Sequence, residues 1–125
     1  MQTDYVPGAP RLAYDHMGDG EVVLFLHGIG GNRTNWRNQL PVFATGYHAV
    51  AWDARGYGQS DDYNGPLDFS DFAHDIVRLQ DHLGVATAHI VGLSMGGRIA
   101  LDFVARYPDR ASSLTLSGTR ASFAQ

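Results

Sequence analysis

Ser94 lies between two glycines, Gly92 and Gly96, where an apolar run at 88–91 meets a run of helical periodicity at 98–106. A serine with glycines two positions before and after it, on a turn from strand to helix, presents a nucleophilic hydroxyl. The chain reverses so sharply there that side chains at the two glycine positions would collide. The free N–H groups that open the following helix can stabilise a developing negative charge. The pattern predicts that Ser94 is the nucleophile of an acyl-transfer reaction.

A glycine-rich turn directly follows the most apolar run of the chain, 22–26. Acyl transfer needs N–H donors aimed at the oxyanion that forms on the acyl carbon. We expect one donor from the backbone of Met95 and the other from the backbone of Ile29. In this interpretation, Gly28 and Gly30 let the backbone approach the substrate closely.

Two larger side chains near the same turn are further candidates to line the substrate pocket. His27 opens the turn and Trp36 follows it. Each has a structural alternative. His27 stands in a backbone turn, which favours a hydrogen-bonding role over that of a base, and packing against the sheet is the competing role for Trp36.

A third segment, 53–61, follows another apolar run and contains two glycines. Its functional interpretation is substrate contact through Asp53 or Arg55, or Asp53 as the acid of a catalytic triad. The alternative is that both side chains bond backbone groups that a tight loop leaves unpaired. We expect the structural role for both residues.

The apolar runs alternate with helical patterns, which predicts an α/β fold with a mostly parallel sheet of about six strands and helices on both faces, a three-layer sandwich. We expect strands at 22–26, 47–52, 89–91 and 113–116, after two short strands of which the second covers 11–17. Ligands bind at the carboxyl ends of strands in such sheets. His27, Asp53 and Ser94 each follow a predicted strand, so all three are expected at one rim.

The helical patterns carry their own start and stop signals. Apolar residues at 72, 76, 79 and 83 form one stripe of a helix. Ser70 is the expected N-cap of this helix and Gly84 its stop. A second stripe within 99–104 is expected to end at Tyr107, because the residue before Pro108 disfavours the helical region.

The composition is that of an ordinary globular domain. The 125 residues carry a formal charge of −4, which favours neither nucleic acid nor an anionic membrane as a partner. The chain has no cysteine, which excludes thiolate catalysis and fits a cytoplasmic location. It shows neither a signal peptide at its start nor an apolar run of about 20 residues that could span a membrane.

The segments 27–31, 53–60 and 92–97 together resemble, in order and spacing, the N-terminal half of an α/β-hydrolase-fold serine esterase or lactonase. The similarity runs from about residue 11 to residue 116 and includes the group of 3-oxoadipate enol-lactonases. It implies that Ser94 is the nucleophile, that Ile29 and Met95 form the oxyanion hole, and that no metal or organic cofactor takes part. It also implies a small carboxylic ester or lactone as substrate.

The chain departs from this family after the nucleophile. The triad of the fold runs serine, acid, histidine along the sequence, yet all six histidines precede Ser94. The acids that follow, Asp102 and Asp109, belong to the next helix or lie just past it. We therefore expect residues 1–125 to be the N-terminal part of a single hydrolase domain that needs a C-terminal half for its base and acid. The last strand would be an open edge, which pairs with that half or with a second copy of the chain.

Two other functions are compatible with parts of the sequence. The chain could be a noncatalytic fragment or binding module that dimerises through its open sheet edge. It could also be a nucleotide-binding unit, since Gly28 and Gly30 follow a strand and Asp53 ends the next one. That interpretation lacks the third glycine, which Arg33 replaces, and it leaves the serine turn unexplained.

Overall fold

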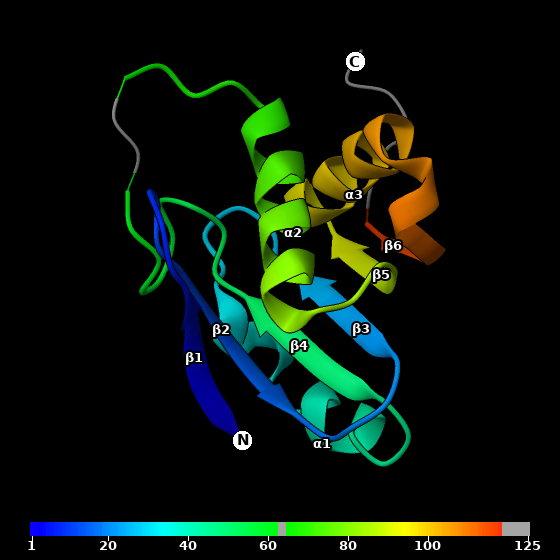
Figure 1. Ribbon diagram of the computed structural model, residues 1–125. Helices are drawn as coiled ribbons and strands as arrows, with labels where there is room; N and C mark the ends of the chain where they lie inside the picture. The colour runs from blue at the N-terminus through cyan, green and yellow to red at the C-terminus, as the bar shows by residue number, and fades with distance from the viewer. Residues whose placement is uncertain (63–64, 119–125) are drawn as a thin grey trace.

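Six strands form one sheet in the computed structural model, which describes residues 1–62 and 65–118 (Figure 1). The strands are β1 (Gln2–Val6), β2 (Leu12–Met17), β3 (Val22–Leu26), β4 (His48–Trp52), β5 (Ala88–Leu93) and β6 (Ala111–Ser117). Their order across the sheet is β1-β2-β4-β3-β5-β6. The prediction of about six strands in an α/β fold is confirmed.

The central part of the sheet is parallel and its N-terminal part antiparallel. Strand β3 pairs in parallel with β4 and β5, and β5 pairs in parallel with β6. Strands β1 and β2 form an antiparallel pair, and β2 adds antiparallel to β4. The carboxyl ends of β3, β4 and β5 therefore lie at one rim, where His27, Asp53 and Ser94 follow them as expected.

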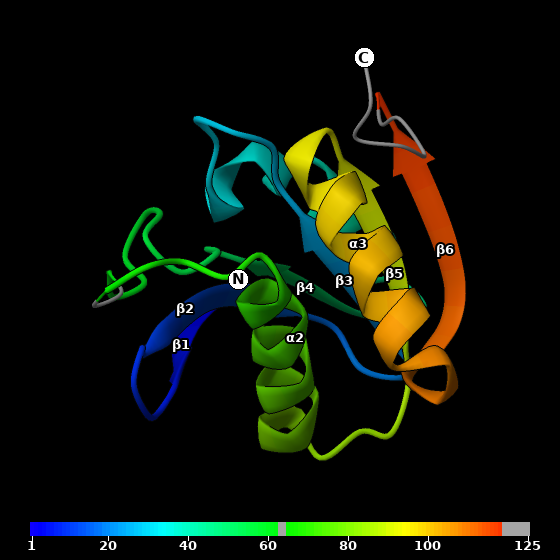
Figure 2. The ribbon, with the colours of Figure 1, turned by 90° about the horizontal axis from the view of Figure 1, so that it is seen from above.

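Helices cover both faces of the sheet. They are α1 (Gln39–Phe43), α2 (Ser70–Leu83) and α3 (Met95–Arg106), with short 3-10 segments at Arg33–Trp36 and Pro108–Arg110. Helices α2 and α3 lie on one side of the sheet and α1 on the other (Figures 1 and 2). All residues of β3 are buried, because a central parallel strand is covered on both faces.

The start of α2 differs from the prediction. Ser70 is the first helical residue, and the carboxylate of Asp68 accepts hydrogen bonds from its backbone nitrogen at 3.0 Å and its hydroxyl at 2.8 Å. These bonds hold the pKa of Asp68 below its ordinary value, since they favour the charged carboxylate. The expectation that Ser70 is the N-cap is therefore wrong. The carboxylate two residues before it satisfies the helix start instead.

The far end of α2 follows the prediction. Gly84 has a φ of 74° and its N–H bonds carbonyls of the last turn, so the left-handed conformation ends the helix. Helix α3 ends at Arg106, before Tyr107 and Pro108. Within the described residues, no helix has the length and apolar character that a bilayer crossing requires.

Candidate active site

Ser94 stands at the junction of β5 and α3 with a φ of 55° and a ψ of −115°. It is the only residue other than glycine with a positive φ in the described part of the chain. Such a conformation costs about 1–3 kcal/mol and persists where the surroundings hold it. Here the serine N–H donates to the carbonyl of Ser117 at 3.0 Å, and the serine carbonyl accepts from Gly97 at 3.0 Å and Arg98 at 3.2 Å. Ser94 itself is exposed, so the strained turn presents its hydroxyl at the surface.

The two glycines of the turn are required by close backbone contacts. A Cβ on Gly92 would lie 2.6 Å from the carbonyl oxygen of Gly96 and from the Cα of Gly97. A Cβ on Gly96 would overlap the carbonyl oxygen of Leu26 and lie 2.8 Å from that of His27. Gly92 therefore makes room for α3, as expected, whereas Gly96 makes room for the end of β3.

The turn that follows β3 lies against the nucleophile. A Cβ on Gly28 would be 3.2 Å from the Cβ of Ser94, and Gly31 donates to the carbonyl of Gly28 at 3.0 Å to close the turn. Gly30 takes a φ of 78° there. A cavity of about 340 Å³ opens beside this contact, lined by Gly28, Ile29, Gly30, Gly31, Asn35, Leu93 and Ser94. The structure thus brings two of the predicted pocket residues, Gly28 and Gly30, together with Ser94 and with Ile29, the predicted oxyanion donor.

A second cavity, of about 440 Å³, adjoins the same site. Its lining residues are Ile29, Arg55, Gly56, Tyr57, Asp62, Leu67, Phe69, Phe72, Met95 and Arg98. Ile29 lines both cavities, and Met95 is buried with its sulfur 3.5 Å from the hydroxyl of Tyr57. Of the two residues predicted to supply oxyanion donors, Ile29 therefore lies between the two cavities and Met95 lines the second one. Sequence reasoning missed this pocket because most of its wall comes from a loop without periodicity.

His27 does not line either cavity. The ring is 1% exposed, and its Nδ1 lies 2.9 Å from the carbonyl of Gly28 while its Nε2 lies 3.1 Å from the backbone nitrogen of Ala54. A neutral ring with its proton on Nδ1 donates to the carbonyl and accepts from the amide. Burial lowers the pKa of His27, which favours that neutral form. The expectation that His27 belongs to the substrate pocket is wrong, because both ring nitrogens join the turns after β3 and β4.

This burial gives a testable pH dependence of folding. In the unfolded chain, His27 binds a proton once the pH falls below its ordinary pKa of 6.5. In the folded chain, burial lowers this pKa, so the ring stays neutral to a lower pH. The free energy of unfolding should therefore fall as the pH drops below about 6.5, by up to about 1.4 kcal/mol per pH unit for this one proton. Urea unfolding between pH 7 and pH 5 measures the slope. His27→Gln should reduce it, while the exposed His74→Gln should not, and equal slopes in both variants would contradict this assignment.

Trp36 lies on another part of the sheet. Its ring packs 5.0 Å from that of Phe25, centroid to centroid, and it lines a groove on the face that α1 covers. It is absent from the described linings of both cavities near Ser94. The expectation that Trp36 walls the substrate pocket is therefore wrong. The competing role, packing against the sheet, is what the structure shows, because the 3-10 segment after the β3 turn carries the ring back over β3.

Asp53 is the centre of a buried network. Its carboxylate is fully buried and accepts from the backbone nitrogen of Arg33 at 2.6 Å, from Arg33 Nη1 at 2.7 Å and from the backbone nitrogen of Gln59 at 2.8 Å. A Cβ on Gly58 would overlap this carboxylate. Asp53 thus ties the turn after β3 to the loop after β4, which is the structural role that we expected.

Arg55 has a structural role, as expected, but the described bonds that give it this role go to a side chain of another element. It bonds the buried carboxylate of Asp75 through Nε at 2.7 Å and through Nη2 at 2.8 Å. This bidentate pair fastens the loop after β4 to α2. Sequence reasoning missed both Asp75 and Arg33 as partners. A signal for Asp75 existed, since it lies three residues after Phe72 and four before Leu79, within the apolar stripe.

Three other histidines, His16, His48 and His89, have hydrogen-bond partners away from the serine turn. His16 lies 2.8 Å from His48 and 2.7 Å from Asp4, which places both rings over the N-terminal strands. His89 contacts Ser113 near the start of β5. That the chain itself brings no base to Ser94 stays a prediction.

Comparisons with known proteins agree with this arrangement. Residues 21–125 match the family described as the alpha/beta hydrolase fold. The dihydrolipoyllysine-residue acetyltransferase component of the acetoin cleaving system of Cupriavidus necator is 38% identical over 107 residues, which are 85% of this chain and 29% of that protein.

Two solved structures have the same fold. A thermophilic esterase from Thermogutta terrifontis, with malate bound, has a TM-score of 0.91 at 31% identity over 100% of this chain and 48% of its own. An N-acyl homoserine lactone degrading enzyme has a TM-score of 0.88 at 31% identity over 93% of this chain and 45% of its own. The chain thus spans less than half the length of each of these three proteins. The serine turn, the glycine turn against it and the matched residues together show that the chain belongs to the α/β hydrolase fold family.

Proposed function

We propose that the chain is the half of a serine hydrolase that carries the nucleophile and the oxyanion hole, and that it acts on small carboxylic esters or lactones once a C-terminal half supplies histidine and acid. One observation carries the proposal. The exposed Ser94 stands on a turn with a φ of 55°, in contact with Gly28 and beside a cavity of about 340 Å³. A strained, exposed serine beside a helix start and a cavity is the arrangement that acyl transfer uses.

The proposed reaction starts with attack by the Ser94 hydroxyl oxygen on the acyl carbon. The serine proton passes to the imidazole of the completing half, and the carbonyl oxygen becomes an oxyanion that the N–H groups of Ile29 and Met95 stabilise. Collapse of this intermediate breaks the bond to the leaving oxygen, which takes the proton from the imidazole. Water then hydrolyses the acyl serine by the same steps. Without the imidazole, the serine is a weak nucleophile at neutral pH.

The cavities support small acyl groups. Volumes of about 340 and 440 Å³ lie at the low end of the range for small-molecule sites. The relatives include an esterase and an enzyme that degrades an N-acyl lactone. Both reactions share the acyl-serine step, so the proposal covers the ester and the lactone substrate together.

Chemical rescue tests this proposal on the chain alone. A fluorophosphonate probe phosphonylates an activated serine, and free imidazole in solution can replace the absent base. The rate at which the probe labels Ser94, followed by intact mass, should rise in proportion to the imidazole concentration. Ser94→Ala should lose the labelling on the peptide that contains residue 94. A rate that does not respond to imidazole would contradict the proposed role of Ser94.

One observation favours the alternative of a noncatalytic module that dimerises. Strand β6 is seven residues long and stands at the edge of the sheet, where Leu116 is 37% exposed. An exposed edge of this kind pairs readily with another chain. Sedimentation of the purified chain separates the two functions. A dimer that Leu116→Lys dissociates, together with no imidazole-dependent labelling of Ser94, would favour the module.

A further inference from the structure

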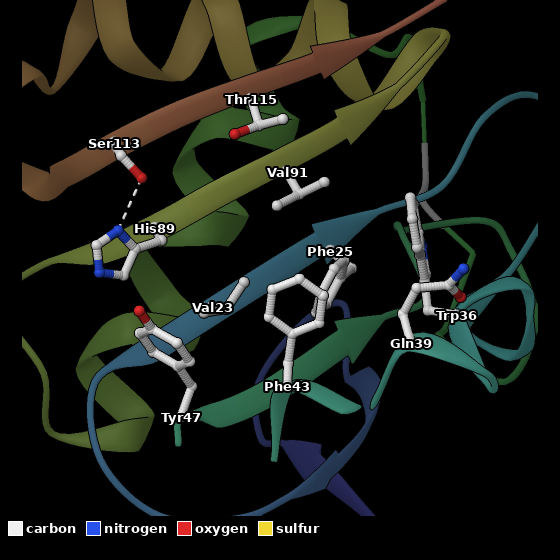
Figure 3. Close-up of a pocket in the computed structure, with 10 residues that line it drawn as sticks. All are labelled: Val23, Phe25, Trp36, Gln39, Phe43, Tyr47, His89, Val91, Ser113 and Thr115. Atoms are coloured by element: carbon white, nitrogen blue, oxygen red, sulfur yellow. Dashed lines mark hydrogen bonds between the residues drawn. The ribbon is translucent and has the colours of Figure 1, made fainter. Parts of the chain in front are cut away.

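A second serine lies in hydrogen-bond contact with a histidine, on the face of the sheet that α1 partly covers (Figure 3). The Oγ of Ser113 is 2.7 Å from the Nδ1 of His89, and the Nε2 of His89 is 3.2 Å from Glu21 Oε1. Ser113 and His89 are direct partners in the β5–β6 pairing, so the register of the sheet places their side chains together. This serine–histidine–glutamate cluster is separate from the Ser94 site.

The order of groups in this cluster is that of an activated nucleophile. With the histidine proton on Nε2, that nitrogen donates to Glu21, and Nδ1 accepts from the hydroxyl of Ser113. The ring of Tyr47 packs edge-on against His89, with 5.8 Å between centroids, and limits its rotation. A nucleophile bonded to a base, which a third group orients in turn, is the signature of nucleophilic catalysis.

The cluster stands at one end of a groove of about 390 Å³, which we call the lateral groove. Its lining residues are Val23, Phe25, Trp36, Gln39, Phe43, Tyr47, His89, Val91, Ser113 and Thr115. Figure 3 shows aliphatic and aromatic side chains between Trp36 at one end and the His89–Ser113 pair at the other. Val91 is half-buried and Phe43 is exposed, so the groove offers apolar surface to a ligand. An ester whose aryl group fills this groove would bring its acyl carbon next to Ser113.

We propose that Ser113 is a second nucleophile, which takes one acyl group from activated aryl esters that bind in the lateral groove. The Oγ of Ser113 forms a bond to the acyl carbon and the bond between that carbon and the aryl oxygen breaks. The serine proton moves to Nδ1 of His89 and then to the departing aryl oxide, so the products are acyl-Ser113 and a phenol. Nothing in this step depends on Ser94 or on a completing half.

The expected rate follows from the groups present. A positioned base contributes about 10²–10⁴-fold. Ser113 lies within β6 rather than at a helix start, so we assign it no oxyanion hole, and such a donor is worth another 10²–10³-fold. We therefore expect one slow, stoichiometric acylation rather than turnover, confined to esters with a good leaving group such as p-nitrophenyl acetate.

The experiment uses the full chain in the Ser94→Ala background, so that its outcome is independent of the proposed function. The protein is treated with p-nitrophenyl acetate, and tryptic peptides are assigned by tandem mass spectrometry. Ser113 lies on the peptide from residue 111 to residue 120, whereas residue 94 lies on another. Acetylation should concentrate on Ser113 and should fall at least about 100-fold in His89→Gln, since the base is then missing.

The neighbouring Ser112 is the matched control, because it is also exposed and lies one position away on the opposite face of the strand. Ser112→Ala should leave the acetylation of Ser113 unchanged, and Glu21→Gln should slow it without disturbing the groove. Circular dichroism checks that each variant is folded. Equal acetylation of Ser112 and Ser113, or a rate on Ser113 that folded His89→Gln and Glu21→Gln variants both retain, would overturn the proposal.

Discussion

Gly96→Ala is expected to cost about 3 kcal/mol of the free energy of unfolding, the upper end of the usual range for overpacking. The new Cβ would overlap the carbonyl oxygen of Leu26 and lie 2.6 Å from the carbonyl carbon. Both are backbone atoms of β3, a central strand that is packed on both faces. Because this strand cannot shift to make room, the added methyl group overpacks the site and destabilises the fold. A domain of this size has about 5–15 kcal/mol in total, so this loss would remove a large share of its stability. Urea unfolding followed by circular dichroism measures the loss.

Gly46→Ala is the matched control for this substitution. No heavy atom lies within 4 Å of the Cβ that would be added at Gly46, and the residue does not have a positive φ. Its free energy of unfolding should change by about 0.5 kcal/mol or less. If the two variants unfolded at the same urea concentration, the close contact between the serine turn and β3 would not exist in the protein.

Asp53→Ala is also expected to be costly, at about 3–5 kcal/mol of the free energy of unfolding. It removes a fully buried carboxylate that accepts from the side chain and backbone of Arg33 and from the backbone of Gln59. Arg33 would keep only Asp15, at 2.9 Å, as a charged partner among its described contacts. Breaking a buried ion pair leaves a desolvated charge uncompensated, which is the origin of the large effect. Thermal or urea unfolding measures it.

Asp81→Ala provides the comparison for an exposed pair. Asp81 bonds Arg110 at 2.7 Å, but its side chain is 65% exposed. Exposed ion pairs contribute about 0–1 kcal/mol, so this variant should be nearly as stable as the parent chain. Similar losses for Asp53→Ala and Asp81→Ala would show that burial does not determine the strength of these pairs, against our account of the loop network.

The predictable part of this molecule is the part where local sequence and tertiary packing agree. The run at 22–26 is apolar on both faces, which predicts a buried parallel strand, and it forms one. The run at 47–52 is also predicted to be a strand, and β4 covers 48–52 of it. The serine turn is predictable because its geometry permits few residue types. The glycines at 92 and 96 indicate that the backbone is closely approached at both positions, and the structure confirms this. The backbone that approaches Gly96 belongs to the end of β3.

The unpredictable part depends on contacts between distant segments. His27 and Trp36 follow the same strand, and the sequence does not show which side of the sheet each ring will face. The partners of Asp53 and Arg55 come from residues 20 positions away, in the 3-10 segment and in α2. Ser113 and His89 meet only through the register of β5 and β6. Pairings of this kind become visible only in three dimensions.

A crystal structure of the chain with a phosphonate attached to Ser94 tests the central claim most directly. The tetrahedral phosphonate oxygen occupies the place of the oxyanion in acyl transfer. We predict that this oxygen accepts hydrogen bonds of about 2.7–3.1 Å from the backbone nitrogens of both Ile29 and Met95. A phosphonate oxygen that instead points to solvent, with neither nitrogen within hydrogen-bond distance, would contradict the assignment of this site as half of a serine hydrolase.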